Sequence, residues 1–150
     1  MSTTQARVER TLAAPVERVF RAWTDPDVLA RWYCPNPEMP LTVEADVVEG
    51  GRYRVVMGPY VAEGTYTSLV PPGTGGPGAV VAFTWRWTSD PDAVEGHVRV
   101  ELDPADGGAT RLVLVHEGLA DAADATGHAE GWELSLDRLA RLEPVASSDA

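Results

Sequence analysis

Two histidines stand where they could perform acid–base chemistry. His116 lies near the end of a strand-like segment and shares its alternation parity with Leu112 and Leu114. His128 follows in a helical segment, one turn before Trp132. Because histidine changes charge near neutral pH, two imidazoles facing one apolar cavity could act as general acid and general base. They could also orient a ligand or be satisfied polar side chains, and the sequence leaves these three alternatives open.

Other catalytic and metal-binding patterns are weak. His116, Glu117 and His128 could in principle bind a metal, but adjacent strand residues point to opposite faces, so Glu117 should face outward. No HxH or HExxH spacing is present, and we expect no metal. Residues 73–78 match G-x-G-x-x-G, yet a strand follows them, so we predict a hairpin loop and no cofactor. The lone Cys34 has no sequence neighbour that would stabilise a thiolate.

Aromatic residues give the clearest indication of a ligand site. Many of them fall on the predicted apolar face of the strand-like segments or on the last helix. Concave pockets with aromatic walls and few polar groups suit apolar or planar ligands, whereas the alternative is a filled core. The residues that we predict to line such a cavity are Trp32, Tyr53, Met57, Tyr66, Phe83, Trp85, Trp87, His116, His128 and Trp132.

The elements that must position these side chains follow from apolar periodicity. Residues 6–12 alternate as a first strand, and 16–23 and 26–32 carry apolar residues at helical spacing. Alternating runs then extend from 41 to 117, with Gly50-Gly51 predicted as a two-residue hairpin turn. These runs predict an antiparallel sheet of about six to seven strands with one apolar and one polar face.

A long helix is predicted to close the chain. Asp121 or Asp124 can cap its start, and we expect it to end at Pro144. Gly127 and Gly131 each cost the helix about 1 kcal/mol relative to alanine, and such glycines often leave space for something else. Together the elements predict an α+β chain in which a curved antiparallel sheet wraps around this helix.

Composition limits the classes of function. The 150 residues suit a single domain, with a predicted core of about 6–142. A net charge of −11 argues against nucleic acid and against anionic membranes as partners. No stretch approaches the roughly 20 apolar residues of a membrane span. One cysteine excludes an internal disulfide, and the first residues lack an apolar signal core, so we expect a cytoplasmic protein.

Several short motifs occur in order along roughly residues 6–142. They are Ala14-Pro15, Ala22–Pro26, Arg31-Trp32, Glu49–Tyr53, Gly64–Tyr66, Phe83–Trp85, Gly108–Leu112, His116–Gly118 and Gly131-Trp132. In these motifs the chain resembles the START/SRPBCC superfamily of Bet v-like helix-grip proteins and, within it, the bacterial branch related to the activator of heat-shock-protein-90 ATPase. The resemblance implies a helix-grip fold with two short helices after the first strand. In one departure, Cys34 stands where the family usually has glycine, at a position that the resemblance implies is the mouth of the cavity.

The resemblance leaves several functions open, because relatives include carriers of hydrophobic molecules, polyketide cyclases and chaperone activators. Our leading prediction is binding of a small hydrophobic or aromatic ligand, polyketide- or lipid-like, between the sheet and the last helix. One alternative is a cyclase, dehydratase or hydrolase that uses the same cavity. Another is a chaperone-activator-like interaction module with an exposed apolar patch. Whether the chain is an enzyme stays open, and an exposed edge strand could pair into a homodimer.

Overall fold

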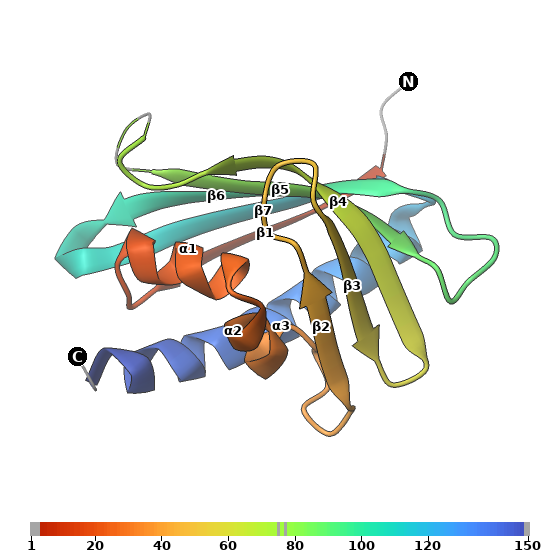
Figure 1. Ribbon diagram of the computed structural model, residues 1–150, viewed down its shortest axis with the longest axis horizontal. Helices are drawn as coiled ribbons and strands as arrows, with labels where there is room; N and C mark the ends of the chain where they lie inside the picture. Colours follow the sequence, from red (N-terminus) through yellow and green to blue (C-terminus); the bar gives the residue numbers. More distant parts are fainter. Residues whose placement is uncertain (1–3, 75, 77, 149–150) are drawn as a thin grey trace.

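A seven-stranded antiparallel sheet forms the body of the computed structural model, which describes residues 4–74, 76 and 78–148 (Figure 1). The strands are β1 (Thr4–Leu12), β2 (Leu41–Ala45), β3 (Arg52–Met57), β4 (Tyr60–Val70), β5 (Ala79–Trp87), β6 (Gly96–Ala105) and β7 (Ala109–Leu119). Their order across the sheet is β1-β7-β6-β5-β4-β3-β2. The first two strands of the chain therefore lie at opposite edges, and the segment that joins them must cross the sheet.

Two short helices make this crossing, as the sequence predicted. They are α1 (Val16–Thr24) and α2 (Pro26–Trp32). Asp25 separates them, because its side chain accepts a hydrogen bond from the backbone N–H of Asp27 at 3.0 Å and so caps α2. The buried residues of α1 recur at helical spacing, which turns one side of the helix to the sheet.

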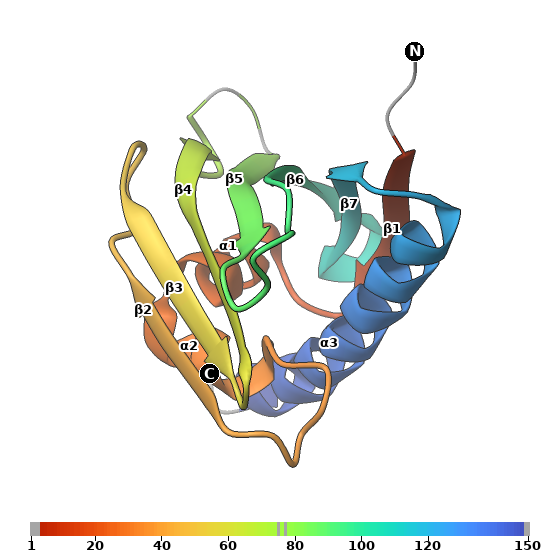
Figure 2. The same ribbon diagram turned by 90° about the vertical axis from the view of Figure 1, so that its right-hand side faces the viewer.

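The long helix α3 (Ala122–Ser148) lies across the open side of the curved sheet (Figure 2). Asp121 caps it, because its Oδ1 accepts from the backbone N–H of Asp124 at 2.9 Å. The predicted end at Pro144 is wrong, since the helix continues to Ser148. A proline removes one N–H, here the one that would reach Ala140, but it does not forbid helical dihedrals in the residues beyond it.

The core fills the space between the concave face of the sheet and the three helices. Strand β6 shows the predicted alternation, with Val98, Val100 and Leu102 buried while the residues between them are exposed. Trp132, Leu136 and Leu139 of α3 are buried as well, so α3 contributes one apolar face to the same core. The predicted α+β architecture, a curved antiparallel sheet around a long last helix, is confirmed.

Two connections bear on sequence predictions. The two-residue turn at Gly50-Gly51 is wrong: β2 ends at Ala45, and residues 46–51 form a longer connection. Gly50 has a φ of +85°, whereas Gly51 is needed for space, since a Cβ there would lie 2.0 Å from the carbonyl oxygen of Asp46. The glycine-rich segment 73–78 joins β4 to β5, although residues 75 and 77 lie outside the described residues.

Among the residues described, no helix combines the length and the apolar character needed to cross a membrane.

Candidate functional site

A cavity of about 540 Å³ lies between the sheet and the N-terminal half of α3. Residues after α2 form one wall, the ends of β3, β4 and β5 form the second, and the first turns of α3 form the third. Tyr60 and Asp90, which are exposed, also border the cavity, so it opens to solvent at this end. Figure 2 faces the end of the molecule where the β5–β6 loop and the start of α3 lie.

Five of the predicted site residues line this cavity: Met57, Trp85, Trp87, His128 and Trp132. The rings of Trp85 of β5 and Trp132 of α3 pack edge-to-face, with centroids 5.5 Å apart. Trp87 packs edge-on against Trp85 at 5.3 Å and continues the wall toward solvent. The structure thus brings together residues of β3, β5 and α3 around one hollow space.

The other five predicted residues lie outside the cavity wall. The indole N–H of Trp32 donates to the carbonyl of Ala22 at 3.1 Å, which ties α2 to α1. Tyr53, Tyr66 and Phe83 pack on one another, with ring centroids 5.5–6.2 Å apart, in the neighbouring part of the core. The fifth residue is His116, which is buried behind Trp132.

Each histidine of the pair accepts a hydrogen bond from a tryptophan. Trp87 donates its indole N–H to His128 Nε2 at 3.1 Å, and Trp132 donates to His116 Nδ1 at 3.2 Å. An imidazole nitrogen that accepts carries no proton, so the proton of His128 is on Nδ1, which lies 2.9 Å from the carbonyl oxygen of Asp124. The two imidazoles, 4.8 Å apart, thereby fix the orientation of two indoles in the cavity region.

His116 is held neutral by its surroundings. Burial first, and then the nearby His128, lower the pKa of His116 to about 3. A group with this pKa stays deprotonated at neutral pH and is a weak base. The geometry therefore supports a positioning role for His116 behind Trp132, while a general acid or base role for the pair remains a prediction.

The buried His116 should make the protein less stable as the pH falls. The unfolded chain binds a proton at His116 below its ordinary pKa of 6.5, whereas the folded chain does not until about pH 3. Protons thus favour the unfolded state, and between these limits the free energy of unfolding should fall by about 1.4 kcal/mol for each pH unit. Denaturant titrations at pH 7, 6 and 5 measure this slope.

His116→Gln removes the titrating group and should flatten this part of the slope, which separates it from the effect of the carboxylates. The matched control is His97→Gln, since His97 is exposed on β6. If wild type and His116→Gln keep the same pH dependence, His116 is not neutral and buried in the folded protein.

The segment after α2 contributes wall residues of which the sequence had placed only Cys34 at the cavity, at its mouth, whereas Tyr33 and Met39 were missed. Tyr33, Cys34 and Met39 all line the cavity, and Cys34 is buried. Helix α3 holds this segment, because Ser135 Oγ donates to the carbonyl of Tyr33 at 2.9 Å and Arg138 donates to that of Cys34 at 2.6 Å. The sequence feature that pointed to this segment was Cys34, which stands where the family usually has glycine.

Two glycines of α3 leave part of the cavity open. Gly127 and Gly131 line it one helical turn apart, and a Cβ built on either would meet no atom within 4 Å. Any larger residue at these two positions would extend its side chain into this volume. The helix-propensity cost noted in the sequence thus coincides with empty space in the structure.

Comparison with protein families agrees with this architecture. The family model described as activator of Hsp90 ATPase homolog 1-like protein matches residues 13–143. The chain belongs to this family. Its membership also places it among the Bet v-like SRPBCC proteins, as the motifs in the sequence indicated. The comparison with curated proteins found no match.

Solved structures similar to this activator-homolog family member share its fold. The AHSA1 protein SPO3351 from Silicibacter pomeroyi is 31% identical, with a TM-score of 0.73, over 95% of this chain and 99% of that one. Protein CV1439 from Chromobacterium violaceum is 29% identical, with a TM-score of 0.74, over 93% and 96%. DynU16, from the dynemicin biosynthetic locus, is 23% identical, with a TM-score of 0.73, over 91% and 46%, which shows the fold alone.

The family motif around Gly51–Tyr53 has a structural explanation. The hydroxyl of Tyr53 donates to the carbonyl oxygen of Thr84, and a Cβ on Gly64 would collide with both groups at 2.7 and 2.0 Å. The ladder between β4 and β5 is interrupted here, and Thr84 Oγ1 accepts from the backbone N–H of Thr65 at 2.9 Å instead. This motif supports the bend of the sheet and lies apart from the cavity.

Proposed function

We propose that this family member binds a small, planar, apolar molecule, polyketide- or lipid-like, in the cavity between the sheet and α3. The observation that carries the proposal is an open space of about 540 Å³ walled by Trp85, Trp87 and Trp132. Protein pockets of roughly 300–1,000 Å³ hold drug-sized molecules, and their walls are mostly apolar with few polar groups. Protein interiors are close-packed, so a space of this size is consistent with a site for a bound molecule.

The hydrogen bonds of the wall favour an apolar occupant. Two of the three wall indoles, those of Trp87 and Trp132, donate their N–H groups to histidines, so their ring surfaces remain for contact with a ligand. Ser135, which also lines the cavity, donates its hydroxyl to the carbonyl of Tyr33. Planar ring systems stack well against such surfaces.

The proposal is tested by titrating the purified protein with 1-pyrenemethanol, a neutral planar compound, and following energy transfer from tryptophan to pyrene. We expect saturable transfer at one molecule per chain. In Trp87→Ala the dissociation constant should rise about tenfold or more, because a half-buried wall ring is lost. No saturable signal in the wild type contradicts the proposal.

Leu134→Ala is the matched control for that titration. Leu134 is on the same helix as Trp132 but is 52% exposed and does not line the cavity. Its truncation should leave the dissociation constant unchanged. Equal losses in Trp87→Ala and Leu134→Ala would mean that pyrene binds elsewhere.

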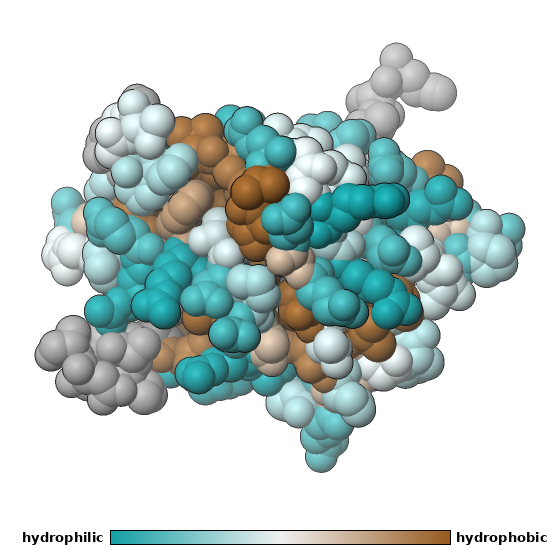
Figure 3. Space-filling model, in the orientation of Figure 1, coloured by the Kyte–Doolittle hydropathy of each residue, from teal (hydrophilic) through white to brown (hydrophobic). Residues whose placement is uncertain are grey.

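The surface offers less support for an interaction module of the chaperone-activator type. The large apolar residues that are exposed among those described are Val48, Tyr60, Val94 and Leu134. They come from four separate segments, and on the face in Figure 3 apolar residues form small patches between polar ones. Such scattered residues are normal for a protein surface, whereas docking sites are contiguous.

A further inference from the structure

We infer that the occupant of the cavity carries a positively charged group, such as an ammonium, on its apolar planar body, and that carboxylates are rejected. This inference rests on the proposed function and specifies the class of ligand. The charged residues that line the cavity are Asp90 and Asp124, and no arginine lines it among the described residues. The chain has no lysine, so arginine is its only permanent side-chain cation.

The segments around the opening repeat this bias. Residues 88–96 and 120–137 hold eight carboxylates between them and no arginine. Glu133 and Asp137 pair with Arg10 of β1, which leaves the other acidic residues to dominate the potential at the opening. A low-dielectric cleft bordered by charges of one sign concentrates ligands of the opposite sign.

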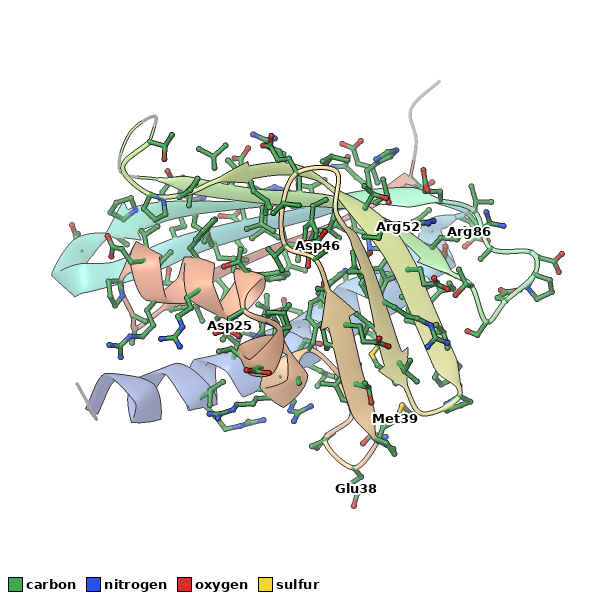
Figure 4. All side chains as sticks on the ribbon, viewed as in Figure 1. Asp25, Glu38, Met39, Asp46, Arg52 and Arg86 are labelled. Carbon is green, nitrogen blue, oxygen red and sulfur yellow. The ribbon has the colours of Figure 1, made fainter. Side chains whose placement is uncertain are left out.

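The nearest candidates for a balancing cation are engaged elsewhere. Arg138 donates both ends of its guanidinium to the carbonyls of Cys34 and Arg31, at 2.6 and 2.8 Å. Arg52 and Arg86 line a separate hollow bordered also by Glu63. Both arginines lie toward the top of Figure 4, whereas Met39, which lines the cavity, lies at the bottom.

Neutral donors do not supply what a carboxylate ligand would need. The indole N–H groups of Trp87 and Trp132 are given to histidines, and that of Trp85 is buried without a partner among the described residues. One indole could donate one hydrogen bond, which does not offset the cost of bringing a carboxylate beside Asp90 and Asp124.

Aromatic rings at the opening suit a cation. Tyr60 is 54% exposed and packs against Trp87 with ring centroids 6.3 Å apart. An ammonium near these rings would meet their negative faces and the carboxylates of Asp90 and Asp124 together. Asp124 is held in place, because its Oδ2 accepts from the backbone N–H of Ala120 at 3.1 Å and its Oδ1 lies 3.2 Å from Nδ1 of His128.

The test compares three compounds with one ring system: 1-pyrenemethylamine, 1-pyrenemethanol and 1-pyrenecarboxylate, titrated against the full chain at pH 7 and low salt. We expect the amine to bind about tenfold or more tighter than the carboxylate, with the alcohol between them. Added salt should reduce the difference. Equal affinities, or tightest binding of the carboxylate, overturn the inference while leaving the proposed function intact. Failure of the alcohol to bind overturns the proposed function itself.

Charge variants separate a local effect from the overall negative charge. Asp124→Asn and Asp90→Asn should each reduce the preference for the amine over the alcohol, measured as the ratio of their dissociation constants, about three- to tenfold. Asp106→Asn, in the exposed turn after β6, makes the same change in net charge away from the cavity and should change nothing. If all three variants reduce the preference equally, the amine responds to net charge alone, and the inference is overturned.

Discussion

Gly131→Phe is expected to abolish binding of neutral planar ligands while the protein remains folded. Gly131 lines the cavity from α3, and nothing lies within 4 Å of the position where its Cβ would stand. A phenylalanine ring there leans toward the N-terminal end of the helix, over Gly127 and His128, which also line the cavity. The ring would occupy the space of the ligand, so we expect the dissociation constant for 1-pyrenemethanol to rise about 100-fold or more.

The stability of this variant should move in the opposite direction to its affinity. Phenylalanine is about 0.3–0.5 kcal/mol better than glycine within a helix, and a Cβ at this position meets no atom within 4 Å. Denaturant titration should therefore give a free energy of unfolding equal to or slightly above that of the wild type. Most variants that lose a function also lose stability, so the two measurements together separate a blocked site from a damaged fold.

Gly131→Ala is the matched control. A methyl group fills little of the cavity and removes the glycine penalty of about 1 kcal/mol, so this variant should be more stable and still bind. If Gly131→Phe binds pyrenemethanol as well as Gly131→Ala does, the ligand does not occupy the cavity beneath α3.

Much of the fold could be predicted because short-range patterns determine it. Asp25-Pro26 specifies both the end of α1 and the start of α2, through one side-chain cap and one ring that fixes φ. Alternation in β6 and β7 identifies the face toward the core, including the inward direction of His116. The turn at Gly50-Gly51 was different, because Gly51 is selected by a close approach of Asp46 that no local pattern reveals.

The cavity was harder to predict, because the alternation of a strand shows which side chains point toward the core but not which of them border an open space. Tyr53, Phe83 and Trp85 all point inward and pack against one another, yet of the three only Trp85 also borders the cavity. That difference depends on which side chains come from α1 and α3, and such contacts are set by packing between distant segments. Tyr60 is the first residue of β4 and Asp90 lies in the loop after β5; periodicity carries little information at such positions, and both residues were missed for this reason.

Trp23→Ala is expected to cause the largest loss of stability of any substitution considered. Trp23 of α1 is 1% exposed and lies at the junction of α2, β5 and α3. Its ring centroid is 4.8 Å from that of Trp32, 6.4 Å from that of Phe83 and 6.0 Å from that of Trp132. Truncation removes a large buried surface and leaves a void, so we expect the free energy of unfolding to fall by about 3–5 kcal/mol.

Trp23→Phe distinguishes the contribution of the ring from that of its polar atom. The indole N–H of Trp23 is buried without a hydrogen-bond partner among the described residues, and such a group costs about 1–3 kcal/mol. Phenylalanine keeps an aromatic ring and removes this N–H, so its loss of stability should be much smaller than that of alanine. Equal losses would mean that the N–H is satisfied in solution, and a loss below about 1 kcal/mol for Trp23→Ala would contradict the central place of this ring. Because Trp23 also supports Trp132, the cavity wall depends on a residue that does not line it.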